Sequence, residues 1–142
     1  MRYFFFSVGL LAGWLGSVAG AAPTDIQIVD AWVHETAGTQ VVLHLTIRNV
    51  GVKGDRLVRV ATSVAEKTVI FNQSGRQAGD LVIPGGSEWM IGTDVPRIEL
   101  VGLTRSLKAP ELFDLLLGFE RAGKVRLTVR VVPAGVNQRA AK

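Results

Sequence analysis

Residues 96–103, Pro-Arg-Ile-Glu-Leu-Val-Gly-Leu, decide the fold that this sequence predicts. Polar and apolar side chains alternate along them, which places Ile98 and Leu100 on one side and Arg97 and Glu99 on the other. This period of two is typical of a β-strand with one buried face. We therefore predict a strand here, with its apolar face in a core and its charged face outward.

The same alternation recurs along the chain. Residues 40–49 place Val41, Leu43, Leu45 and Ile47 on one face and Gln40, His44, Thr46 and Arg48 on the other. Residues 125–131 alternate in the same way, and the shorter runs 26–35, 56–65, 67–73, 81–83 and 87–91 are also strand-like, with Trp32 expected as a core aromatic. Glycine- and proline-bearing turns separate them, and residues 74–80 are expected to form a loop. Together they predict an all-β fold, an antiparallel, immunoglobulin-like β-sandwich of seven to nine short strands.

The run Leu112–Phe119 has two interpretations. Its leucines suit a buried helix as well as a fully buried strand. Arg121-Ala122-Gly123-Lys124 then predicts a hairpin-like link to the closing strand, but it does not decide between the two.

Composition indicates one globular domain preceded by a short extra segment. The chain has 142 residues, of which 48% are hydrophobic and 20% charged, and it has no cysteine. Residues 1–21 combine a charged start, an apolar run and an Ala19-Gly20-Ala21 cleavage pattern, which predicts a cleaved signal peptide and a periplasmic location. The alternative is that Phe4–Ala22 stays attached as a membrane anchor. Residues 22–132 would form the domain, and residues 133–142 a disordered basic tail.

Several short motifs carry a resemblance to a known family. They are Asp30-Ala31-Trp32-Val33, then residues 45–51 (Leu-Thr-Ile-Arg-Asn-Val-Gly) with Asp55-Arg56-Leu57, then Ile83-Pro84-Gly85-Gly86, Val101-Gly102-Leu103 and residues 119–123 (Phe-Glu-Arg-Ala-Gly). In this order and spacing, the sequence resembles the PCuAC-type periplasmic copper chaperones over about residues 26–132. The resemblance implies a cupredoxin-like β-sandwich. It also implies delivery of Cu(I) for cytochrome oxidase assembly, with an oxidase copper subunit or a Sco-type protein as partner.

The resemblance further implies where copper would bind. Members of that family bind Cu(I) with two His-x-Met pairs and a Met in a loop, because Cu(I) is soft and favours thioether and imidazole. In this chain the first pair falls on Phe71 and Gln73, and the second on Arg97 and Glu99. Phe71 has no donor atom and Arg97 is a permanent cation. We therefore expect no bound cofactor, with Cu(I) as cargo only if the family function survives.

The four positions are expected to form a small polar patch, for which two interpretations remain open. One is an ordinary solvated face, in which Arg97 pairs with Glu99 or lies over the Phe71 ring. The other is a docking surface, in which Arg97 and Phe71 contact a partner protein, since arginine and aromatic residues are enriched at interfaces.

A replacement metal site would have to use His34, His44 or Met90. A hairpin centred near Thr39 would place His34 opposite His44, close enough for the two imidazoles to share an ion. Two ligands without a third make this a weak candidate. Met90, beside Trp89, is expected to fill the core.

Catalysis is not expected. The sequence has no cysteine nucleophile, no Gly-x-Ser-x-Gly motif and no carboxylate pair with acid/base spacing. An exported chain with scattered charge is also a poor nucleic-acid binder, and no membrane contact is expected after signal cleavage. The sequence therefore predicts an exported protein that resembles copper chaperones but has lost the family copper site. The alternative is a metal-free protein-binding or scaffolding module of the cell envelope.

Overall fold

A computed structural model describes residues 25–135, which form ten β-strands and no helix. The predicted signal peptide, 1–21, and residues 136–142 of the predicted tail lie outside the described residues. No helix that could span a membrane is present among residues 25–135. The strands are β1 (Ile26–His34), β2 (Gln40–Asn49), β3 (Asp55–Ala61), β4 (Ala65–Phe71), β5 (Gln77–Ala78), β6 (Leu81–Ile83), β7 (Glu88–Ile91), β8 (Arg97–Leu103), β9 (Leu112–Phe119) and β10 (Gly123–Val132).

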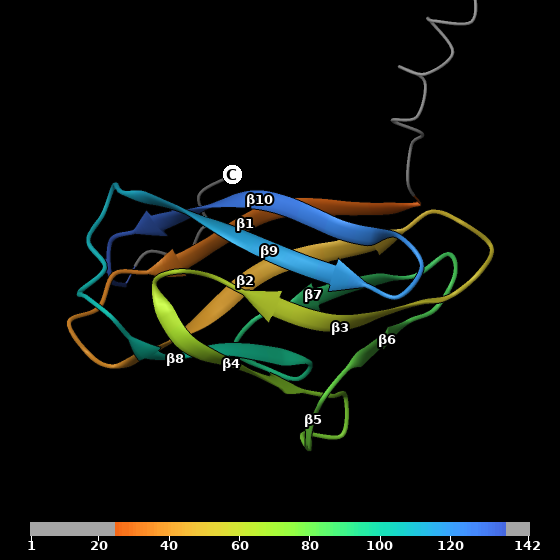
Figure 1. Cartoon of the computed structure of the whole chain (residues 1–142), viewed down its shortest axis with the longest axis horizontal. Helices are drawn as coiled ribbons and strands as arrows, with labels where there is room; N and C mark the ends of the chain where they lie inside the picture. The colour runs from red at the N-terminus through yellow and green to blue at the C-terminus, as the bar shows by residue number, and fades with distance from the viewer. Residues whose placement is uncertain (1–24, 136–142) are drawn as a thin grey trace, which may run out of the picture.

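The strands form one curled sheet in the order β5-β4-β8-β2-β1-β10-β9-β3-β6, with β7 also paired to β2. Figure 1 shows β1, β9 and β10 side by side, with β4 and β8 across the molecule from them. Between β3 and β4 the Thr68 hydroxyl donates a 2.8 Å hydrogen bond to the Val60 carbonyl. The all-β prediction is confirmed, with two differences of detail: there are ten strands, and β1 pairs in parallel with β10.

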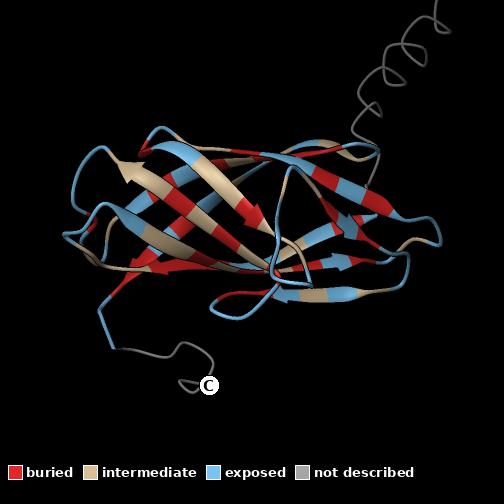
Figure 2. Ribbon diagram, turned by 90° about the horizontal axis from the view of Figure 1, so that it is seen from below, coloured by how far each residue is buried: buried red, intermediate tan, exposed pale blue. Residues whose placement is uncertain are grey.

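One apolar core lies on the inner face of the curled sheet. Figure 2 shows buried residues interleaved with exposed ones along the strands, as the alternation in the sequence predicts. The largest side chains with almost no exposed surface are Leu43, Ile47, Leu57, Leu81, Ile83, Ile91, Ile98, Leu100, Leu107, Leu115, Leu117 and Val33. Ile98 and Leu100 of the opening stretch are among them, so the face predicted to be buried is the core face.

Local packing settles what the sequence left open. Residues 112–119 are strand β9, held between β10 and β3 by antiparallel pairing on both edges. The predicted hairpin from β9 to β10 is present, with Gly123 at a φ of 81°. Within the predicted loop 74–80, Gln77 and Ala78 form the short strand β5, because the chain turns back at once and pairs with the end of β4.

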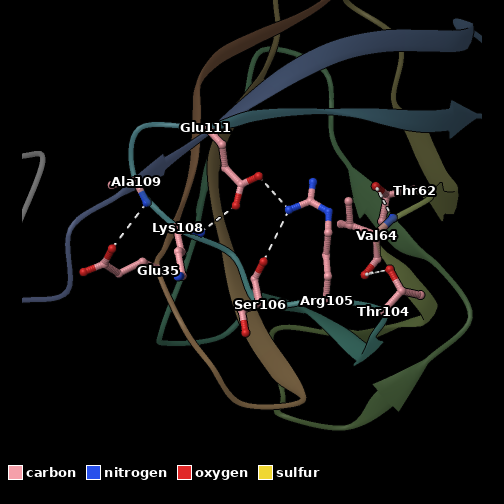
Figure 3. Close-up of polar contacts among 9 residues, drawn as sticks. All are labelled: Glu35, Thr62, Val64, Thr104, Arg105, Ser106, Lys108, Ala109 and Glu111. Carbon is pink, nitrogen blue, oxygen red and sulfur yellow. Dashed lines mark hydrogen bonds and ion pairs between the residues drawn. The ribbon is translucent and has the colours of Figure 1, made fainter.

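The connection from β8 to β9 is held by several side chains (Figure 3) and by one isolated backbone bridge. The Glu111 carboxylate accepts hydrogen bonds from the Lys108 amide and from the Arg105 guanidinium. A Glu35 oxygen accepts one from the Ala109 amide, and Thr36 and Leu107 exchange backbone hydrogen bonds. This connection therefore stays against the hairpin that joins β1 and β2.

Asp55 fixes the far end of the fold. It begins β3 and is buried, and one carboxylate oxygen accepts from the amides of Arg56 and Arg121 at 2.7 and 2.8 Å. The other oxygen accepts from the Ala122 amide at 2.9 Å. The carboxylate thus satisfies amides of the β9–β10 turn that have no ladder partner.

Replacing Asp55 with alanine should lower the free energy of unfolding by about 2–4 kcal/mol, since three amides lose a charged acceptor. Chemical denaturation followed by circular dichroism measures this. Asp114→Ala is the matched control, because Asp114 is exposed on β9, and it should change stability by less than about 0.5 kcal/mol. Equal effects of the two changes would contradict this role of Asp55.

The hydrogen bond from the Lys108 amide lowers the pKa of Glu111 from its ordinary value, with a further contribution from Arg105. Because the pKa of Glu111 is lower in the folded protein than in the unfolded one, its ionised carboxylate stabilises the fold at pH values above the unfolded-state pKa. This contribution to the free energy of unfolding is lost as the pH falls through the folded-state pKa. In an NMR titration, the Lys108 amide shift should therefore move with a midpoint below that of a free glutamate. Glu111→Gln should abolish this titration, and a midpoint at or above the free value would contradict the assignment.

Candidate functional site

Phe71 and Arg97 meet at the centre of the predicted patch. They are directly opposite one another in the antiparallel pairing of β4 with β8. The Arg97 guanidinium carbon lies 4.5 Å from the centre of the Phe71 ring, which is cation–π geometry. The prediction that Arg97 lies over Phe71 agrees with this contact.

Glu99 completes the patch as an ion-pair partner. Arg97 Nε lies 2.9 Å from Glu99 Oε2, although the direction of its N–H bond does not make a hydrogen bond. Another guanidinium nitrogen donates to the Thr93 carbonyl at 3.2 Å. The side chains of Arg97 and Glu99 are 29% and 18% exposed, so the pair is shielded more than a typical surface ion pair.

Gln73 does not join this patch in the way that the sequence suggested. β4 ends at Phe71, and the chain then enters a tight turn in which Asn72 Oδ1 accepts from the amides of Ser74 and Arg76. Gly75, at a φ of 82°, closes the turn. Gln73 is therefore exposed in a turn and does not follow Phe71 along a strand face.

These residues do not suit Cu(I). Phe71 offers no donor, Arg97 brings a fixed positive charge into the space between the strands, and the Glu99 carboxylate is paired with it. No group of three or more His, Cys, Asp or Glu side chains that could hold a metal occurs within residues 25–135. What the patch offers chemically is a shielded cation beside an aromatic ring.

The two histidines lie on the same sheet face, but not in the predicted register. Trp32, not His34, is opposite His44, because this pairing is centred on Gly38 rather than on Thr39. A bulge between Val29 and Trp32 adds one residue to β1 and so turns Trp32 and His34 to the sheet face that carries His44. Asp30 within the bulge has a φ of 56°, which is uncommon for a residue other than glycine. His34 is therefore a diagonal neighbour of His44, with 5.7 Å between the ring centres.

The bulge also changes the role of Trp32. The sequence predicts it as a core aromatic, and its exposed fraction is only 8%, but it is not part of the core cluster. Its ring lies instead on the outer face, stacked on His44 at 4.0 Å and 5° and edge-on to His34 at 5.0 Å. No signal in the sequence indicates this arrangement, because the strand pattern alone does not reveal a bulge.

Met90 is also placed differently. The prediction that it fills the core is wrong, since the side chain is 48% exposed. It pairs with Thr46 on the outer face of β7 and β2, two residues along β2 from His44. The thioether therefore faces outward on the face that carries the histidines.

The family and the fold emerge from comparison with known proteins. Residues 26–131 match the family described as "Putative lipoprotein LpqE-like". No curated protein matches the chain in sequence. Among solved structures, the apo PCuAC domain from PmoF1 has a TM-score of 0.73 at 18% identity, covering 79% of this chain and 97% of that one.

Two further solved structures were determined with copper. The copper-bound PCuAC domain from PmoF2 has a TM-score of 0.68 at 20% identity, covering 79% of this chain and 96% of its own. The solution structure of Cu(I)-DR1885 from Deinococcus radiodurans has a TM-score of 0.67 at 19% identity, covering 88% and 89%. These likenesses confirm the predicted PCuAC fold.

The Phe71–Arg97 contact should be measurable as a coupling in stability. A double-mutant cycle of Phe71→Leu and Arg97→Met should give a coupling of about 0.5–1 kcal/mol, because the cation–π pair is partly shielded from water. Urea denaturation of the four proteins provides the values. The same cycle with Lys67→Met in place of Arg97→Met is the control and should be additive, since Lys67 is exposed and four residues from Phe71 along β4. Additivity in both cycles would contradict the contact.

Proposed function

Because this chain belongs to the LpqE-like family and has the PCuAC fold, we propose that it is an exported periplasmic protein that resembles copper chaperones but does not hold Cu(I) at the family position. Its role is binding rather than catalysis. The proposal concerns the positions of Phe71, Gln73, Arg97 and Glu99.

The observation that carries this proposal is the position of Arg97. Its guanidinium lies over the Phe71 ring and against Glu99, so the place where the resemblance puts the copper ligands is occupied by a cation. A second cation there would be repelled, and neither neighbour offers a thioether or imidazole in compensation. The copper-bound PmoF2 domain and Cu(I)-DR1885 bind copper within the same fold, which supports a change of donors rather than a change of fold.

Export is part of the proposal. The signal-like residues 1–21, with cleavage after Ala21 or Ala22, would release the domain into the periplasm. The family description includes the word lipoprotein, but none of the 142 residues is a cysteine. A lipid attached through a cysteine sulfur is therefore not available to this sequence.

A second candidate function is a protein-binding or scaffolding module of the cell envelope. The observation that favours it is the partial exposure of Arg97 next to Phe71, two residue types enriched at interfaces. By resemblance, the partner would be an oxidase copper subunit or a Sco-type protein. An Arg97→Glu protein that folds normally but loses a partner in pull-downs would favour this candidate.

A Cu(I) titration of the purified protein against a chromophoric chelator, under reducing conditions, tests the main proposal. Arg97→Ala and Glu99→Ala should leave the Cu(I) affinity and stoichiometry of the protein unchanged, because neither position holds copper. The combined change Phe71→His, Arg97→His and Glu99→Met should add one Cu(I) equivalent over the parent, because it places two imidazoles and a thioether on paired strands.

Two outcomes would contradict the proposal. One is weaker Cu(I) binding in Arg97→Ala or Glu99→Ala than in the parent. The other is a triple variant that folds normally and gains no copper, which would mean that these positions do not form the family site. The control for added ligands is His and Met at Lys67 and Val69, farther along β4, which should add no tight equivalent.

A further inference from the structure

Trp32, His34 and His44 form a compact ring cluster on the outer face of β1 and β2, two strands that are neighbours in the sheet (Figure 1). Trp32 is buried there without belonging to the core, so the two imidazoles help to cover it. Both histidines keep intermediate exposure. The cluster therefore combines fixed rings with access from solvent.

Contacts around the cluster hold the two imidazoles in place. The His44 ring lies flat on the Trp32 ring, 4.0 Å away and only 5° from parallel. His34 Nδ1 lies 3.4 Å from the Pro133 carbonyl oxygen, the kind of second contact that fixes the tautomer of a metal-binding histidine and leaves Nε2 for the metal.

Gly92 makes room for the second ring. A Cβ atom at this position would lie 2.9 Å from His44 Nδ1, so only glycine lets the β7–β8 connection pass so close to the imidazole. The connection continues to Thr93, whose carbonyl accepts from Arg97. One short segment thus packs against the histidine cluster and the Arg97 patch.

The spacing of the two imidazoles suits a shared ion. Two imidazoles with a metal about 2 Å from one nitrogen of each have ring centres roughly 5.2 Å apart at a tetrahedral angle and roughly 6.4 Å apart in a linear arrangement, so an intermediate spacing suits a bent pair of donors. The ring centres of His34 and His44 are 5.7 Å apart. We propose that His34 and His44 bind one Cu(I) ion between their imidazole rings. This goes beyond the function proposed above, since it concerns different residues.

The number and kind of donors select the ion. No third His, Cys, Asp or Glu completes a metal-binding group among the described residues, whereas structural Zn²⁺ almost always takes four ligands. Imidazole is a ligand that suits copper, and the singly charged Cu(I) ion needs fewer donors than Zn²⁺ does. Its single charge also limits repulsion by Arg97, which is itself paired with Glu99.

Met90 is not part of this pair. His34 lies on β1, at one edge of β2, whereas Met90 lies on β7, at the other edge. Along β2, Met90 is level with Thr46, which lies beyond His44 in the direction away from His34. If the two imidazoles bind the ion, the Met90 thioether takes no part in binding. Replacing Met90 is therefore a matched control, because it removes a soft sulfur ligand from the same sheet face without touching the site.

The test is a titration of the full chain with Cu(I), under reducing conditions, against a chromophoric chelator. We expect one equivalent to bind. His34→Ala and His44→Phe should each weaken binding by more than about a hundredfold, since loss of an outer-shell contact alone costs up to that much. Phenylalanine at residue 44 keeps a ring against Trp32, and His34 ends β1, so at least one of the two variants should keep the fold, as circular dichroism would verify.

Met90→Leu and Arg97→Ala should leave this affinity unchanged. X-ray absorption of the copper complex should show nitrogen and no sulfur neighbours. Because the chain has only two histidines, both sets of imidazole NMR signals should shift together at one equivalent.

Absence of Cu(I) binding, a sulfur neighbour, or binding that survives either histidine change in a folded protein would overturn the inference. Binding that is lost in Arg97→Ala and retained in both histidine variants would overturn this inference and the proposed function together. Binding that is lost only with the histidines supports the inference and leaves the proposed function standing.

Discussion

The pairing of strand β2 along both of its edges determines how the neighbouring strands are placed. One edge pairs with β1, and the other pairs first with β8 through Leu43 and then with β7 from Leu45. The change of partner occurs at His44. The β7–β8 connection must therefore cross the outer face at this residue, and it brings Gly92 and Thr93 with it. Both outward-facing clusters take their positions from this single strand.

The outer face consequently carries two sets of contacts that share one segment. On β4 and β8, Arg97 is held by a ring, a carboxylate and the Thr93 carbonyl. On β1 and β2, the imidazoles are held by Trp32 and by the backbone at Gly92 and Pro133. The first set already holds a cation, the Arg97 guanidinium, whereas the second presents two neutral-type ring donors, the imidazoles of His34 and His44. The chemistry of this face thus differs between neighbouring strands while the backbone fold is that of PCuAC domains.

The sequence predicted what depends on a period of two and missed what depends on a single inserted residue. β2 was predicted with its observed bounds, and β8 within one residue, because alternation is a local property of the chain. The bulge at Asp30 is not local in this sense, since a positive φ at aspartate persists only where the surroundings hold it. It turned Trp32 and His34 to the outer sheet face, beside His44. The Asn72 turn likewise takes Gln73 off the strand face on which Phe71 lies opposite Arg97.

The parallel pairing of β1 with β10 has a consequence for how the chain acquires its fold. The first and last strands of the domain are neighbours, with Trp32 level with Arg130 and His34 level with Val132. During synthesis from the N-terminus, β1 lacks this partner until the ribosome has made β10, about a hundred residues later. Contacts between such distant segments form slowly, because the whole intervening loop must be ordered first. The pairing that joins the two ends of the described domain is thus the last that the growing chain can form.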